Sequence, residues 1–94
     1  MKGTNKKAAA QDCAQFTISG TVEKVYRGRD NDFASIKVQP NPDDYYDLIR
    51  VACPKDAEIE EGDSITASGT ISTFFDRNKK VQNIKFNASE VKPR

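Results

Sequence analysis

Apolar and polar residues alternate along most of this chain with a period of two, and this pattern most constrains its fold. The stretch Phe16-Thr-Ile-Ser-Gly-Thr-Val22 is a clear instance. Clusters rich in Gly, Pro, Asn and Asp interrupt the alternation about every 8 to 12 residues. Because successive side chains of a strand point to opposite faces, this pattern indicates half-buried strands joined by turns. The chain is therefore predicted to be all-β.

The alternation predicts five strands. The first runs from Phe16 through Val22 to Tyr26, and its two valines, Val22 and Val25, are three positions apart. A bulge near Glu23–Lys24 would restore the inward direction, and Gly20 marks a bend or a close backbone approach. The other strands are expected at 33–39, from Tyr45 or Tyr46 to Cys53, at 64–73 and at 81–91, with residues 27–32 and 74–80 as turn and hairpin loop. The expected inward residues are Ala34, Ile36 and Val38; Ile49, Val51 and Cys53; Ile65, Ala67, Gly69 and Ile71; and Ile84, Phe86 and Ala88.

A length of 94 residues allows one small domain with a thin core. Small residues recur at inward positions, as a tight barrel interior requires, and the first strand is long and bent. These features favour a five-stranded, partly open Greek-key barrel of the OB type with little helix. A small sandwich or an SH3-like barrel is the alternative. The barrel is expected over residues 16–92, and residues 1–15 read as a flexible N-terminal arm.

Composition argues against an enzyme. The chain has no His, so the commonest general base and metal ligand is missing. Its net charge is +1. Asp43, Asp44 and Asp47 could hold a hard cation, but a solvated acidic loop is the favoured interpretation. We therefore expect no metal site and no cofactor. No segment approaches membrane-spanning length or resembles a signal peptide, so a cytoplasmic protein is expected.

The two cysteines, Cys13 and Cys53, lack metal-ligand spacing. Two unrelated free thiols are the favoured interpretation, and a disulfide or a redox pair stays open. Because Cys53 continues an apolar alternation, it is expected to be a small buried side chain.

The candidate binding residues lie on the outer face of the second and third strands. If Ala34, Ile36 and Val38 point inward, the neighbouring positions point outward and bring rings and cations together. This face holds Phe33, Lys37, Tyr46, Leu48 and Arg50. Rings on which bases stack, next to cations that neutralise phosphates, are what single-stranded nucleic acid requires. Cross-strand packing, a covering loop or a dimer interface would also use such residues.

Two loops strengthen the nucleic-acid interpretation, because the loops after strands one and four flank the binding face of OB barrels. Both combine aromatic residues with at least two cations. The first contributes Tyr26, Arg27 and Arg29, and the second contributes Phe74, Phe75, Arg77, Lys79 and Lys80.

Four segments resemble bacterial and phage single-stranded DNA-binding proteins and the small primosomal OB-fold proteins of replication restart. They are Ile18-Ser-Gly-Thr-Val22, Tyr46-Asp-Leu-Ile-Arg-Val-Ala52, Glu61-Gly-Asp-Ser-Ile-Thr-Ala-Ser-Gly-Thr-Ile71 and Ile84-Lys-Phe-Asn-Ala-Ser-Glu-Val91. The resemblance implies an OB barrel over 16–92 and favours DNA over RNA. Those proteins often carry a helix between strands three and four, for which 54–63 leaves little room. They also commonly end in an acidic tail, unlike Val91-Lys-Pro-Arg94.

These observations predict a non-enzymatic protein that binds single-stranded DNA, with RNA as the second possibility, in replication, recombination or repair. A second copy of the chain or replication proteins are the expected protein partners. The alternative is an OB module for protein–protein interaction, or a subunit of a larger complex, which the near-neutral charge and the outward Leu48 motivate.

Overall fold

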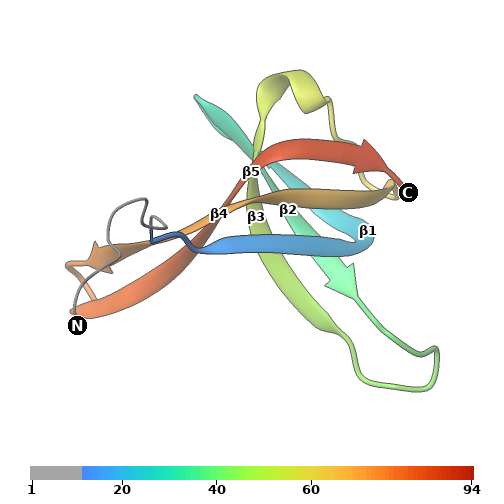
Figure 1. Cartoon of the computed structure of the whole chain (residues 1–94), viewed down its shortest axis with the longest axis horizontal. Helices are drawn as coiled ribbons and strands as arrows, with labels where there is room; N and C mark the ends of the chain where they lie inside the picture. Colours follow the sequence, from blue (N-terminus) through green and yellow to red (C-terminus); the bar gives the residue numbers. More distant parts are fainter. Residues whose placement is uncertain (1–11) are drawn as a thin grey trace, which may run out of the picture.

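The computed structural model describes residues 12–94, which form one barrel (Figure 1). Its strands are β1 (Gln15–Arg27), β2 (Asn31–Val38), β3 (Asp47–Pro54), β4 (Ser64–Asp76) and β5 (Val81–Pro93), with a short 3-10 helix, η1 (Lys55–Ala57), after β3. The strands close in the order β1-β2-β3-β5-β4. Only β3 and β5 pair in parallel. The all-β, five-stranded barrel with little helix is confirmed. The predicted arm lies mostly outside the described residues.

The first strand, β1, is long because it pairs with two other strands, β4 and β2. Its first half, Gln15–Thr21, pairs with β4, and its second half, Thr21–Arg27, pairs with β2. At the crossing, a Cβ on Gly20 would overlap the carbonyl oxygen of Lys37 and come within 2.8 Å of Ile36 Cγ2. The predicted close approach is therefore real, and only glycine fits it without displacing β2.

The predicted bulge also exists, between Val22 and Lys24. Beside it, Val22 is hydrogen-bonded to the connection before β4. The N–H of Val22 donates to Asp63 O (2.8 Å), and the N–H of Gly62 donates to Val22 O (2.8 Å). At the bulge the ladder with β2 shifts by one residue. The shift turns Val25 toward the core, as predicted, and Tyr26 toward the outer face.

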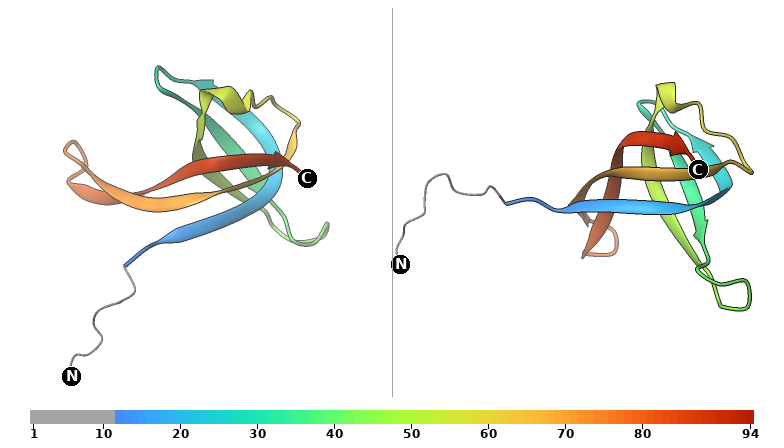
Figure 2. Two further views of the ribbon diagram at one scale, coloured as in Figure 1. Left: turned by 45° about the horizontal axis from the view of Figure 1, so that its top comes forward. Right: turned by 45° about the vertical axis from the view of Figure 1, so that its right-hand side comes forward.

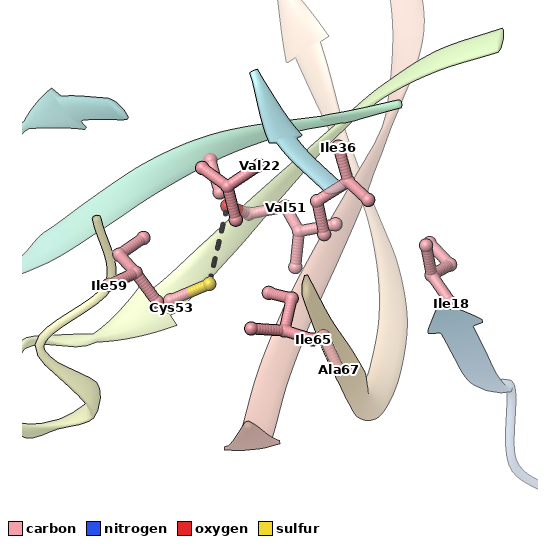
Figure 3. Packing of buried hydrophobic residues seen from close by; sticks show 9 residues of the cluster. Ile18, Val22, Ile36, Val51, Cys53, Ile59, Ile65 and Ala67 are labelled. Atoms are coloured by element: carbon pink, nitrogen blue, oxygen red, sulfur yellow. Dashed lines mark hydrogen bonds between the residues drawn. The ribbon is translucent and has the colours of Figure 1, made fainter. Parts of the chain in front are cut away.

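The core is thin, as expected for this length (Figure 3). The fully buried large side chains are Ile36, Ile59, Val22, Val51 and Cys53. Ile59 comes from the connection between β3 and β4 and packs in the core cluster with side chains of the strands. The Cys53 thiol contacts Val51 O at 3.8 Å, whereas Cys13 is exposed. Both cysteines are free, so the favoured interpretation of two separate thiols holds.

The hairpin of β4 and β5 extends beyond the barrel (Figures 1 and 2). The pairing of β1 with β4 ends at Gln15 and Thr70, and β3 pairs with β5 only near Phe86. Residues 71–85, which we call the distal ribbon, continue as two strands and a turn. The turn occupies 77–80, so the predicted loop at 74–80 was too long.

Strand boundaries shift in two places that matter for the site. Phe74 and Phe75 belong to β4, because they pair with Asn83 and Gln82 in β5. Asp32, expected in a turn, belongs to β2 and is 3% exposed. Ile84, expected inward, is 63% exposed because the distal ribbon has left the barrel. Within residues 12–94, no helix is both long and apolar enough to cross a membrane.

Candidate nucleic-acid interface

The outer face of the sheet is continuous across four strands of the barrel. Cα pairing links Tyr26 of β1 with Phe33 of β2, Phe33 with Ala52 of β3, and Ala52 with Asn87 of β5. Residues opposite one another in adjacent strands share a face. Alternation from Asn87 through its partner Thr70 then puts Phe74 of the distal ribbon on this same face. The face therefore carries predicted residues from both flanking segments as well as from β2.

Cations on this face lie over aromatic rings. The guanidinium of Arg50 is 4.8 Å from the ring centroid of Phe33 and 5.4 Å from that of Tyr26. The ammonium of Lys37 is 4.8 Å from the ring of Tyr46. These are cation–π distances. The structure thus brings together the rings and cations that alternation placed on the outer face.

A hollow of about 370 Å³ lies between β2, β3 and the distal ribbon. Ala52 of β3 forms part of its lining and is 5% exposed. The lining residues are Phe33, Arg50, Ala52, Phe74, Ile84, Lys85 and Phe86. The lining thus combines the aromatic rings of Phe33, Phe74 and Phe86 with two cations, Arg50 and Lys85.

Arg27 was predicted to face the ligand, but its guanidinium is bonded elsewhere. It donates to Asp32 Oδ2 (2.9 Å) and to Ile59 O (3.0 Å). Lys55 Nζ donates to Asp32 Oδ1 (2.8 Å). The Lys55 ammonium and then the Arg27 guanidinium hold the pKa of Asp32 below its usual value, although burial opposes them. This cluster ties β1, β2 and η1 together at the end of the barrel.

The remaining predicted cations lie in the two turns. Arg29 is exposed in the short turn between β1 and β2. The exposed Arg77, Lys79 and Lys80 occupy the tip of the distal ribbon. Asp76 Oδ1 accepts the N–H groups of Asn78 (2.9 Å) and Lys79 (3.1 Å), which fixes this turn. Phe75 is 56% exposed, and alternation turns it to the opposite face of the ribbon from Phe74.

Two cations of the face were not predicted. Lys24 Nζ lies 5.9 Å from the ring of Tyr26, and Lys85 lines the hollow. Lys24 could have been found by alternation from Tyr26 once the bulge was placed. Lys85 follows from the same rule applied to the expected strand at 81–91. Both lysines lie within strands, whereas most of the predicted cations lie in turns.

The acidic loop before β3 is organised by its own hydrogen bonds. Asn41 Nδ2 donates to Asp44 Oδ2 (2.8 Å), and Gln39 Nε2 donates to Asp44 O (2.6 Å). Among residues 12–94, no three His, Cys, Asp or Glu side chains are grouped so that they could hold a metal ion.

Comparison with solved structures identifies the fold. Two crystal structures of the mitochondrial single-stranded DNA binding protein Rim1 from S. cerevisiae superpose with TM-scores of 0.71 and 0.70. Sequence identities are 13% and 10%; the matches cover 87% and 88% of this chain and 95% and 96% of the Rim1 chains. The chain has the OB fold. No family model and no curated protein sequence matches it. At this identity the likeness concerns the fold, and function must be argued from the site.

Proposed function

We propose that this protein binds single-stranded nucleic acid, DNA in preference to RNA, without catalysing a reaction. The observation that carries the proposal is the outer face, where Arg50 and Lys37 lie over the rings of Phe33 and Tyr46. The similarity to Rim1, a mitochondrial single-stranded DNA binding protein, supports the choice of ligand. A role in replication, recombination or repair is part of the same proposal.

Stacking and charge supply the affinity. Each base stacked on an aromatic ring contributes about 1–3 kcal/mol, and the face offers Phe33 and Phe74 around the hollow and Tyr26 beside it. Every base has a π-face, so this surface accepts many sequences. Lys24, Lys37, Arg50 and Lys85 lie close enough to the rings to meet the phosphates that follow stacked bases.

The tip of the distal ribbon extends this track. Arg77, Lys79 and Lys80 lie just beyond Phe74, on the turn that Asp76 fixes. The loop before β3 is acidic at the other end, with Asp43 and Asp44 exposed. A polyanion is therefore attracted toward the distal ribbon and repelled by that loop. The near-neutral net charge is compatible with binding because the charges are segregated.

Fluorescence polarisation with labelled dT and rU oligomers over a salt series tests the proposal. We expect saturable binding, tighter for dT, whose logarithmic affinity falls linearly with the logarithm of salt concentration by about 0.7 per phosphate contact. Replacing Asp43 and Asp44 with Asn should tighten binding at low salt. An affinity for dT that does not change between low and moderate salt would contradict the proposal.

Protein–protein interaction is a second candidate, and exposed apolar residues of the distal ribbon favour it. Phe75 is 56% exposed on the face of the ribbon opposite Phe74, and Ile84, which lines the hollow, is 63% exposed. Leu48 of β3 is also exposed. Size-exclusion chromatography with light scattering, with and without dT, distinguishes the two functions. A stable dimer whose mass does not change when dT is added would favour protein–protein interaction. A complex that forms only when dT is present would favour nucleic-acid binding.

A further inference from the structure

The side chain of Arg50 occupies the surface that a base would need. Its guanidinium lies 4.8 Å from the centroid of Phe33, and both residues line the hollow. Gly28 lies against one edge of the same ring, since a Cβ added there would come within 3.0 Å of Phe33 Cε2. A base that stacks on Phe33 at the hollow must therefore share the ring with the Arg50 guanidinium or displace it.

Arg50 is held by rings rather than by carboxylates. None of the ion pairs formed within residues 12–94 includes it. Its contacts are the rings of Phe33 and Tyr26. Cation–π contacts at exposed sites are weak enough to exchange, and no buried charge is left behind when the guanidinium leaves.

We propose that Arg50 stacks on Phe33 in the free protein, and that a bound strand replaces its guanidinium with a base while the guanidinium moves to an adjacent phosphate. The inference rests on the proposed function and adds a conformational step to it. Arg50 is thereby both a competitor for the stacking site and a ligand of the backbone.

The magnitudes favour the exchange. Losing a cation–π contact at an exposed site costs about two- to fivefold in affinity. Stacking a base on an aromatic ring gains about 5- to 150-fold, and the phosphate contact adds to this gain. The free protein therefore keeps Arg50 on the ring, and the nucleic-acid complex does not.

Salt dependence separates the two roles of Arg50. In the Arg50→Ala variant one phosphate contact is lost, so the slope of log affinity against log salt becomes shallower by about 0.7. The ring of Phe33 is also free, which favours stacking. We expect this variant to bind dT more weakly than wild type at low salt and about two- to fivefold more tightly near 1 M salt, where phosphate contacts are screened.

Lys85→Ala is the matched control. Lys85 lines the same hollow, but its removal uncovers no ring held by a cation–π contact. Its affinity curve should approach that of wild type at high salt without crossing it. A crossing for Arg50→Ala alone supports the exchange.

NMR of the arginine side chains gives a direct readout. Protons of Arg50 should be shifted upfield by the ring currents of Phe33 and Tyr26, and Phe33→Leu should reduce the shift to the part that Tyr26 causes. Saturation with a dT oligomer should move these signals downfield, toward those of the exposed Arg29.

The outcomes are distinct. Binding of dT by wild type with the upfield shift retained, or with no crossing for Arg50→Ala, overturns the exchange and leaves the proposed function standing. Absence of dT binding by wild type at every salt concentration overturns both.

Discussion

Phe33 is the residue whose replacement tests the binding face most sharply. In Phe33→Leu the side chain stays apolar and of similar size, but its π-face is lost. Removing one stacked base costs about 1–3 kcal/mol, so we expect Kd for dT to rise about 5- to 150-fold. In the folded protein the ring also contacts the Arg50 guanidinium, at 4.8 Å. Losing that contact costs about 0.5–1 kcal/mol, or roughly 2–8 °C in Tm for a domain of this size.

Tyr45→Leu is the control for this change. Tyr45 is 99% exposed and precedes β3, away from the hollow. Its loss should leave Kd within about twofold of wild type. Kd is measured by fluorescence polarisation and folding by circular dichroism on the same samples. The reasoning is refuted if folded Phe33→Leu binds dT as wild type does, or if Tyr45→Leu weakens binding as much.

Three further predictions concern folding. Gly69→Ala should melt well below wild type or fail to fold, because the added Cβ would overlap Asn87 O and lie 2.8 Å from Ser89 N, both backbone atoms; a thermal melt checks this. The depressed pKa of Asp32 stabilises the fold above the unfolded value of about 3.9. The urea midpoint should therefore fall as pH drops below that value, and less so in Asp32→Asn. Burial raises the pKa of the Cys53 thiol to about 11. An unfolded thiol ionises near 8.5, so stability should fall as pH rises from there to about 11, and Cys53→Ala should remove this component of the urea-midpoint profile.

Much of the binding face could be predicted because alternation is a local property. Once Ile36 and Val51 are assigned to the core, Phe33 and Arg50 must point outward if their strands are regular. The bulge of β1 could be predicted for the same reason, from the spacing of two valines. These inferences needed only neighbours along the chain.

The errors came from contacts between distant residues. Asp32 has the composition of a turn, but Lys55, 23 residues away, neutralises it and allows burial. Asp and Asn mark the turn after Phe75 correctly, yet pairing with Gln82 extends β4 almost to that turn. Alternation assigns Ile84 to the same face as Phe86. The position along β5 at which the barrel ends depends on how many of its residues pair with β3. That number cannot be inferred from the residues next to Ile84 in the sequence.

The parallel contact of β3 with β5 is short, limited to Val51 with Phe86 and Ala52 with Asn87. Together with the longer ladder of β1 with β4, it joins two units that are each local in sequence, the β1–β2–β3 meander and the β4–β5 hairpin. Such a seam opens more readily than the ladders on either side, so its amides should exchange with solvent by sub-global opening. A strand lying across Phe33 and Phe74 spans both sides of the seam. Binding would therefore slow hydrogen exchange at the seam, because a strand that bridges the seam stabilises its closed form.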